Sequence, residues 1–293
     1  MCGLLHYCPQ CVSILQTLTG ETRAKPAPST LQVLTGNIFL GIRTADAHIV
    51  TMRLTGKTAI VTGAGSGFGA GIAQRLAQEG ARVLVADING DAANEVAARI
   101  NASPWVVDVS DNTSVQRMAG KMPNPDIIVN NAGITHLPQP MEDVSEDDFD
   151  RVFRVNMKSV FLMSRHFVPA MKTRGSGAIL NIASTAGISP RPNLNWYNAS
   201  KGWMITATKA MAVELAPFGI RVNALNPVAG ETPLLKTFMG EDTPEIRAKF
   251  LSTIPLGRFS TPEDMGAAAA FLCSDDASMI TGVAMEVDGG RCI

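Results

Sequence analysis

The sequence predicts a single-domain α/β protein with a doubly wound, mostly seven-stranded parallel sheet. Short apolar runs alternate with helical stretches from residue 58 to the end of the chain, which is typical of a parallel sheet covered by helices on both faces. A glycine-rich loop joins the first apolar run to the first helical stretch. Doubly wound sheets bind their ligands at strand-to-helix junctions of this kind.

The predicted elements follow one another without an internal linker or repeat. Apolar runs predict strands over 58–62, 82–86, 104–107, 126–130, 178–182, 221–225 and 283–287. Helical periodicity predicts helices over 70–80, 92–100, near Val115, and over 145–172, 199–215 and 266–272. Ser145 and Asp148 have the spacing of a capping box at the start of the longest helix. Right-handed crossovers between parallel strands then give a Rossmann-type topology over residues 52–293.

The composition indicates a packed globular protein that binds neither nucleic acid nor membrane. Hydrophobic residues make up 46% and charged residues 17% of the 293 residues, and the formal net charge is -1. The chain has no long basic run for nucleic acid, and no apolar stretch reaches the roughly 18 residues that span a bilayer. Only Cys273 and Cys292 follow Met52. We therefore expect a reducing, cytoplasmic compartment rather than a disulfide framework.

Residues 1–51 are predicted to lie outside this domain. They have no clear periodicity, and they lack the basic start of a secretory signal. We expect either a poorly structured extension or translated sequence upstream of a start at Met52. This segment also contains potential metal ligands, but their spacing is too crowded for a known zinc module, so we predict no metal site. These ligands are Cys2, His6, Cys8 and Cys11.

The loop after the first strand has the composition of a dinucleotide-binding turn. Pyrophosphate needs backbone N–H groups and the N-terminus of a helix, and side chains at the glycines would obstruct its approach. The spacing here is Thr-Gly-x-x-x-Gly-x-Gly rather than the generic G-x-G-x-x-G pattern. The residues predicted to contact the cofactor are Gly63, Ser66, Gly67, Phe68 and Gly69.

An acidic residue at the end of the second strand predicts the choice of cofactor. Asp87 can accept hydrogen bonds from both adenosine ribose hydroxyls of NAD, and it would repel the 2′-phosphate of NADP. Its neighbours Ser66, Ile88 and Asn89 offer no positive charge to that phosphate. The predicted cofactor is therefore NAD, with Ile88 beside the adenosine; the alternative for Asp87 is an ordinary turn residue.

A tyrosine and a lysine at the start of the fifth helical stretch could act together on a proton. Tyr197 and Lys201 lie one helical turn apart and share a face. An ammonium group and a positively charged nicotinamide would both favour the phenolate, which lowers the pKa of the tyrosine from about 10. By itself, such a pair is common and carries little weight.

The series of motifs, taken together, resembles the short-chain dehydrogenase/reductase family. The resemblance runs from about Leu54 to Gly290, and its motifs come in the order of that family. They are Thr62–Gly69, Asp87, Asp108-Val109, Asn130-Asn131-Ala132-Gly133, Asn156, Ser184, Tyr197 with Lys201, Asn226-Pro227 and Asp288-Gly289-Gly290.

The resemblance implies four catalytic residues. Tyr197 would exchange a proton with the substrate oxygen, and Ser184 would hydrogen-bond that oxygen. Lys201 would bind the nicotinamide ribose and lower the pKa of Tyr197. Asn156 would hold a water that relays protons from Lys201 to solvent. Without the resemblance, Asn156 is predicted to be a structural polar residue that makes a hydrogen bond. It lies on a predicted buried helix face with Phe149, Val152, Phe153 and Val160.

The resemblance also implies further cofactor contacts. Asp108 and Val109 would flank the adenine. The wall beneath the riboses would come from Asn130, Asn131, Ala132, Gly133 and Ile134, and Pro227 and Thr232 would approach the carboxamide. In this last region the chain reads Pro227-Val-Ala-Gly-Glu-Thr232, whereas many members have Pro-Gly after the strand.

The substrate is predicted to be a small alcohol or ketone. The family's lid would lie at 233–255, where apolar side chains either line the pocket or pack beneath the lid as local core. These side chains are Leu234, Leu235, Phe238 and Met239, and the other candidate lining residues are His136, Thr185, Pro190, Arg191 and Trp196. We expect His136 to face solvent. The resemblance further implies a homotetramer or homodimer formed through the helices over 161–167 and 204–215 and the segment 284–293.

Two other functions are compatible with these motifs. A 3-oxoacyl-thioester reductase would usually need NADPH and a basic docking patch, which Asp87 and the composition disfavour. A non-catalytic dinucleotide-binding regulatory protein would not need the full set Asn156, Ser184, Tyr197 and Lys201. An epimerase or dehydratase of the extended family needs a larger C-terminal domain than this chain can supply.

Overall fold

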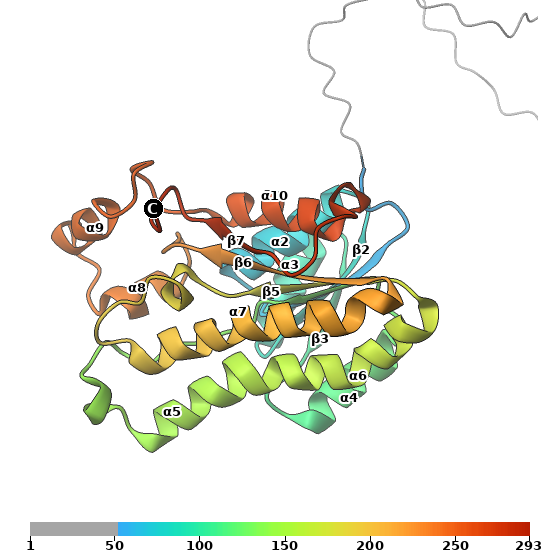
Figure 1. Ribbon diagram of the computed structural model, residues 1–293, viewed down its shortest axis with the longest axis horizontal. Helices are drawn as coiled ribbons and strands as arrows, with labels where there is room; N and C mark the ends of the chain where they lie inside the picture. Colours follow the sequence, from blue (N-terminus) through green and yellow to red (C-terminus); the bar gives the residue numbers. More distant parts are fainter. Residues whose placement is uncertain (1–51) are drawn as a thin grey trace, which may run out of the picture. The chain divides into compact units, whose positions relative to one another are not determined.

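The sheet is fully parallel and contains seven strands, as predicted. The computed structural model describes residues 52–293 (Figure 1). The strands lie in the order β3-β2-β1-β4-β5-β6-β7, so the direction of winding reverses between β1 and β4. Their bounds are β1 Thr58–Thr62, β2 Arg82–Asp87, β3 Ser103–Val106, β4 Ile127–Asn130, β5 Gly177–Ile182, β6 Ile220–Pro227 and β7 Ala284–Val287.

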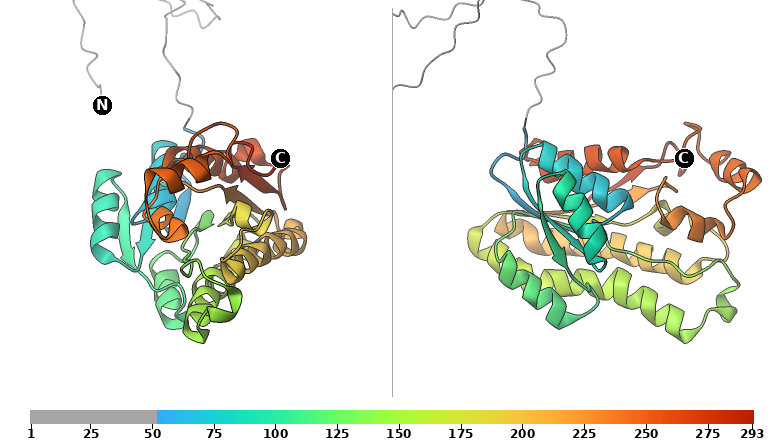
Figure 2. Two further views of the ribbon diagram at one scale, coloured as in Figure 1. Left: turned by 90° about the vertical axis from the view of Figure 1, so that its left-hand side faces the viewer. Right: turned by 180° about the vertical axis from the view of Figure 1, so that it is seen from behind.

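Helices cover both faces of the sheet (Figures 1 and 2). One layer consists of α2 (Gly67–Gln78), α3 (Gly90–Arg99) and α10 (Pro262–Cys273), and the other of α4 (Asn112–Lys121), α6 (Ser159–Arg174) and α7 (Asn195–Leu215). Strand residues alternate between the two layers: Val61 packs with the first layer and Ile60 with the second. Because both faces are buried, the strands read as continuous apolar runs. No helix within residues 52–293 is both long and apolar enough to cross a membrane.

The predicted helix over 145–172 is divided into three parts. It consists of α5 (Glu146–Phe153), a π-helical turn (Arg154–Lys158) and α6. The Ser145 hydroxyl accepts a hydrogen bond from the Asp148 amide, but the Asp148 carboxylate pairs with Arg151. The predicted capping box is therefore wrong in its second half.

The start of α10 does contain a complete capping box. The Thr261 hydroxyl accepts from the Asp264 amide, and the Asp264 carboxylate accepts from the Thr261 amide. Both bonds satisfy amide donors that a helix N-terminus leaves unpaired. They explain why α10 begins four residues before the predicted start at Gly266.

Two short helices lie beyond the carboxyl ends of the strands, in the segment predicted as a lid. They are α8 (Leu234–Met239) and α9 (Pro244–Leu251) (Figure 1). A small apolar cluster holds them to the loops that follow β6 and α9; it contains Val228, Leu235, Met239, Ile254 and Phe259. The predictions for residues 1–51 concern a segment outside the described residues. They include the potential ligands Cys2, His6, Cys8 and Cys11.

A buried carboxylate ties the entry to β1 to the end of α2. Glu79 is almost fully buried, and its carboxylate pairs with Arg53 at 2.7 Å and with Arg75 at 2.8 Å. The hydrogen bonds from Arg53, Arg75 and the Arg53 amide outweigh the burial of the carboxyl group, and they lower the pKa of Glu79 to about 2. Ionised Glu79 therefore stabilises the folded state.

We predict that Glu79→Gln lowers the free energy of unfolding by about 3 kcal/mol at pH 7, since this is the linkage value of a carboxyl pKa near 2 against an ordinary 4.5. A carboxyl group whose pKa is lowered by folding stabilises the folded state at pH values above its unfolded pKa. The difference in stability between the two proteins should therefore shrink as the pH falls from about 4.5 toward 2. Urea unfolding of both proteins between pH 7 and pH 3 measures it.

The control is Glu95→Gln, which neutralises an exposed glutamate on α3 that forms no ion pair with any described residue. It should leave stability within about 0.5 kcal/mol of wild type. A gap between Glu79→Gln and wild type that does not narrow at acid pH would contradict the assigned role of the ionised carboxylate.

Candidate active site

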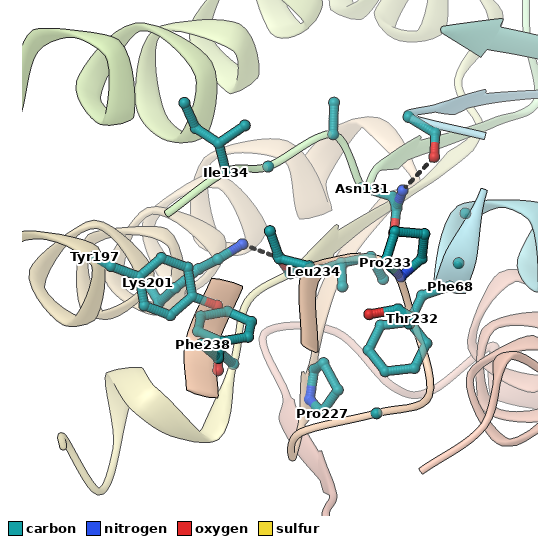
Figure 3. Close-up of a pocket in the computed structure, with 18 of the residues that line it drawn as sticks. Phe68, Asn131, Ile134, Tyr197, Lys201, Pro227, Thr232, Pro233, Leu234 and Phe238 are labelled. Carbon is teal, nitrogen blue, oxygen red and sulfur yellow. Dashed lines mark hydrogen bonds between the residues drawn. The ribbon is translucent and has the colours of Figure 1, made fainter. Parts of the chain in front are cut away.

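A cavity of about 480 Å³ lies at the carboxyl ends of the central strands, between the sheet and α8. Figure 3 shows Tyr197 and Lys201 across this cavity from Phe68 and Thr232. Of the catalytic and cofactor residues predicted above, all but Asn130 and Asn156 line it. The lining set is Gly63, Ser66, Gly67, Phe68, Gly69, Asp87, Ile88, Asp108, Val109, Asn131, Ala132, Gly133, Ile134, Ser184, Tyr197, Lys201, Pro227 and Thr232.

The glycine loop has no room for side chains. A Cβ atom on Gly69 would lie 2.2 Å from the Gly63 carbonyl oxygen, and one on Gly63, which has φ +61°, would lie 2.8 Å from the Ala132 backbone. Ser66 caps α2 without a side-chain hydrogen bond. Among the described residues, the amides of Gly67, Phe68 and Gly69 have no hydrogen-bond acceptor. These donors at a helix N-terminus fit a pyrophosphate.

Asp87 is held by the loop that it faces. One carboxylate oxygen accepts from the Gly65 amide at 2.8 Å and the other from the Asn89 amide at 2.9 Å. No lysine, arginine or histidine of residues 52–293 pairs with this carboxylate. The adjacent Ile88 is 70% exposed. This end of the cavity therefore presents a fixed negative charge with free acceptor capacity.

Hydrogen bonds join β1 to β4 at the centre of the site. The Asn131 amide group donates to the carbonyl oxygens of Thr62 (2.8 Å) and Gly63 (3.0 Å), and the Thr62 hydroxyl accepts from the backbone of Asn131 and Ala132. Asn130 does not line the cavity, and its side-chain nitrogen instead donates to the Asn181 side-chain oxygen at 2.8 Å. The expectation that Asn130 forms part of the wall is therefore wrong, because alternate strand residues point to opposite faces.

Tyr197 and Lys201 lie on one face of α7, as their spacing predicts. The Lys201 ammonium donates to the Ile182 carbonyl oxygen at 2.8 Å and lies 5.8 Å from the centre of the Tyr197 ring. The other side of that ring packs edge-on against Phe238 of α8, with the ring centres 5.0 Å apart. Ser184 follows β5, and its hydroxyl accepts from the Ala186 amide.

Burial controls the ionisation of this pair in the polypeptide. It raises the pKa of Tyr197 to about 12, although the Ser184 hydroxyl and the Arg191 charge act in the opposite direction. Burial also lowers the pKa of Lys201 to about 8. In the polypeptide alone, the pKa of Tyr197 is therefore raised, because burial outweighs the effects of Ser184 and Arg191, and the lowering of this pKa by Lys201 stays a prediction.

Asn156 lies outside the cavity, in the π-helical turn between α5 and α6. Its side-chain oxygen accepts from the Ile134 amide, and its nitrogen donates to the Ile134 carbonyl and the Ser200 hydroxyl, each at 2.9 Å. It thereby fixes a wall residue against α7. The predicted buried stripe is partly wrong, because Phe149 and Phe153 are 41% and 44% exposed.

The two alternatives for the lid residues both apply, one to each side of α8. Leu234 and Phe238 line the cavity, whereas Leu235 and Met239 pack in the cluster beneath. Residues four apart share a helix face, which separates the two pairs.

Only two of the other candidate lining residues reach the cavity, namely Thr185 and Arg191. Pro190 and Trp196 do not line it. The prediction for His136 is wrong, since it is 1% exposed and its ring bonds the Leu137 carbonyl instead of facing solvent.

The sequence analysis missed several apolar and backbone positions of the lining. Most directly follow strands or belong to the loop after β6, and no chemical signature distinguishes them; Phe250 comes from α9, which had not been predicted as a helix. They are Val107, Val155, Ile182, Ala183, Ala186, Leu194, Val228, Ala229, Gly230, Pro233 and Phe250.

Comparison with known proteins places this geometry among oxidoreductases. A family model described as enoyl-(acyl carrier protein) reductase matches residues 63–291. The chain is 49% identical over 252 residues to 4-formylbenzenesulfonate dehydrogenase of Comamonas testosteroni, covering 83% of this chain and 100% of that protein.

Solved structures agree with the sequence comparison. The crystal structure of 3-ketoacyl-(acyl-carrier-protein) reductase from Brucella melitensis complexed with NADH is 51% identical, with a TM-score of 0.77 over 82% of this chain and 100% of that chain. A short-chain type dehydrogenase/reductase from Mycobacterium marinum is 35% identical, with a TM-score of 0.76 over 82% and 97% of the two chains. With its parallel sheet, glycine loop and Tyr-x-x-x-Lys pair, the chain belongs to the short-chain dehydrogenase/reductase family.

Proposed function

We propose that the protein is an NAD-dependent dehydrogenase that interconverts a secondary alcohol and a ketone. The observation that carries the proposal is the convergence of Ser184, Tyr197 and Lys201 on one end of a cavity whose other end carries Asp87. When bound, NAD⁺ accepts the hydride from the alcohol carbon, and NADH returns it to the carbonyl carbon in the reverse reaction.

The cofactor would be held by groups that the fold leaves unpaired. The amides of Gly67, Phe68 and Gly69 would bind the pyrophosphate, and Asp87 would accept from the adenosine ribose hydroxyls. Asp108 and Val109 would flank the adenine. Asn131 to Gly133, with Lys201, would contact the riboses, and Pro227 and Thr232 would lie near the carboxamide.

Tyr197 would act as the general acid and base. During oxidation its phenolate oxygen takes the hydroxyl proton of the alcohol, and during reduction the phenol returns that proton to the substrate oxygen. The Ser184 hydroxyl would donate to the same oxygen while negative charge develops on it. Lys201 would hold a positive charge beside the phenolate. A water held by Asn156 as a proton relay stays a prediction from the family resemblance.

Asp87 also bears on the alternative of a 3-oxoacyl-thioester reductase. One structural neighbour is named as a ketoacyl carrier-protein reductase, so this activity belongs in the same assays. The fixed carboxylate of Asp87 favours NAD over NADP. A non-catalytic binding protein is less consistent with a site in which the tyrosine, the serine and the lysine all line the same cavity.

Assembly and compartment follow the same proposal. Large apolar side chains are exposed on α5, α6 and α7, and burial of such a face against a second copy would remove it from water. These are Phe149, Phe153, Phe161, Trp203 and Val213. We propose a homotetramer or homodimer through these helices. Cys273 and Cys292 form no disulfide within residues 52–293, which is compatible with the proposed cytoplasmic location.

We predict that Tyr197→Phe lowers NAD-linked turnover of a secondary alcohol panel by about 10²- to 10⁴-fold, since it removes the proton-transferring oxygen. NADH affinity, measured by fluorescence titration, should change by less than about threefold because the ring stays in place. Trp196→Phe is the matched control, because Trp196 precedes Tyr197 on α7 but does not line the cavity. Equal losses of turnover in both variants would contradict the assigned role of Tyr197 in proton transfer.

The ionisation of Tyr197 gives a second, independent test. Because burial raises its pKa to about 12, the protein without cofactor should show no Tyr197 phenolate absorbance up to about pH 10. Added NAD⁺ brings a positive charge, which should lower this pKa and produce phenolate below pH 10. The chain has two tyrosines, so the Tyr197→Phe variant supplies the blank. Identical titrations with and without NAD⁺ would contradict the proposed phenolate.

Cofactor choice is tested at Asp87. Asp87→Asn keeps an acceptor for the Gly65 amide but removes the charge, so the preference for NAD over NADP, as a ratio of kcat/KM values, should fall about 10- to 100-fold. Asp91→Asn removes an exposed charge four residues away and should leave the ratio unchanged. A wild-type protein that uses both cofactors equally would overturn the assignment.

A further inference from the structure

The end of the cavity beyond Tyr197 contains an arginine that the proposed reaction does not use. Arg191 lines the cavity, and its guanidinium lies 4.3 Å above the centre of the Phe250 ring of α9, which also lines it. Its carbonyl oxygen accepts from the Asn198 side chain at 2.7 Å, which fixes the loop against α7. The guanidinium is near enough for its charge to act on the Tyr197 phenol.

Arg191 has no acidic partner in the part of the chain that the structure describes. None of the ion pairs within residues 52–293 includes it, and its side chain donates no hydrogen bond to another described residue. The pKa of Arg191 is lowered by burial first, and then by the charge of Arg291. Arginine rarely loses hydration without a partner for its fork of donors.

A second arginine adds to the positive charge of this region. Arg291 donates to the Ser189 hydroxyl at 3.3 Å, and its Nε atom is buried with no acceptor among the described residues. The charge of Arg291 acts on Arg191, and neither guanidinium group forms an ion pair within residues 52–293, so Arg191 presents to the cavity a positive charge without an ion-pair partner. An anion placed there would gain charge-assisted hydrogen bonds and reduce the repulsion.

Apolar side chains contact both Tyr197 and Arg191. Phe238 packs against the tyrosine ring and Phe250 against the guanidinium group, and both line the cavity together with Leu234. A hydrocarbon frame fits these walls, with a carbonyl at Tyr197 and a charged group at the other end.

We propose that the substrate is an anionic hydroxy or keto compound whose carboxylate or sulfonate pairs with Arg191 while its reacting oxygen lies at Tyr197. This inference rests on the proposed function and deepens it by naming the substrate class. Arg191 is then the residue that determines specificity for a charged substrate, and the Phe250 ring holds its guanidinium plane in place.

Matched ketones test the inference. 4-Oxocyclohexanecarboxylate is compared with its neutral methyl ester, and 4-acetylbenzenesulfonate with the neutral sulfonamide, each in NADH-linked reduction and in binding to the protein–NADH complex by calorimetry. Wild type should favour at least one anion over its neutral partner by about 10- to 100-fold in kcat/KM, which is the usual effect of a hydrogen bond to a charged group. The pair with the larger anion-to-neutral ratio of kcat/KM values shows whether the site favours a carboxylate or a sulfonate.

Arg191→Gln should remove this preference by lowering kcat/KM for the anion about 10- to 100-fold more than for its neutral partner, while Arg191→Lys should restore part of it. Lys236→Gln is the control, because it removes one positive charge from an exposed position on α8 and should keep the preference. NADH affinity should be equal in all four proteins. A merely structural Arg191–Phe250 contact would instead reduce charged and neutral turnover equally.

The outcomes separate this inference from the proposed function. One outcome is that wild type reduces the neutral ketones, that Tyr197→Phe does not, and that neither anion has an advantage. This result would overturn the proposed anionic substrate and leave the proposed dehydrogenase function intact. Anions that neither bind the protein–NADH complex nor react would overturn it as well. Binding of the anions through Arg191 without any turnover would support the anion site and contradict the proposed reaction.

Discussion

The common direction of all seven strands is the constraint on which the site depends. In a parallel sheet the carboxyl ends of the strands meet at one edge, so the loops that follow them converge whatever their distance in sequence. Gly63, Asn131 and Ser184 follow three different strands and Asp87 ends a fourth, and all four line one cavity. The Thr62 and Asn131 bonds then fix the two strands between which the winding reverses.

This constraint also explains how much could be predicted from the sequence. Strands buried on both faces are continuous apolar runs, and the glycine and polar residues of the site follow or end them, so the sheet and these positions of the cavity could be predicted. The apolar and backbone positions of the lining could not, because they carry no chemical signature in the sequence. The features that the sequence did not predict depend on contacts between segments that are distant in the sequence. The π-helical turn at Asn156 has no period of its own, and the burial of His136 depends on packing that a loop sequence does not reveal. Phe149 and Phe153 follow an amphipathic period, yet they are exposed in the single chain.

Tyr197 and Lys201, the proposed reacting pair, are both deeply buried. Both Tyr197 and Lys201 are nearly inaccessible, and burial favours the neutral form of each. Within the polypeptide, the Ile182 carbonyl is the hydrogen-bond acceptor of the ammonium group, and a buried charge with a single acceptor is costly. A proton held this way moves when a further charge enters the cavity, because one charge at short range in a medium of low dielectric outweighs desolvation. We therefore expect the ionisation of Tyr197 to be coupled to binding of the proposed cofactor.

The two ends of the cavity carry opposite charges, and this polarity orders the ligands. Asp87 and the helix N-terminus of α2 suit the diol and the pyrophosphate of NAD, whereas Arg191 carries a positive charge into another part of the lining. An anionic substrate that entered the cofactor end would meet the Asp87 carboxylate. At the Arg191 end, the proposed anion would be attracted to the guanidinium group, with its reacting oxygen near Tyr197. Arg191 also favours the phenolate of Tyr197. Neutralisation of Arg191 by the bound anion would weaken that effect, so substrate charge and the basicity of the catalytic tyrosine are linked through one guanidinium group.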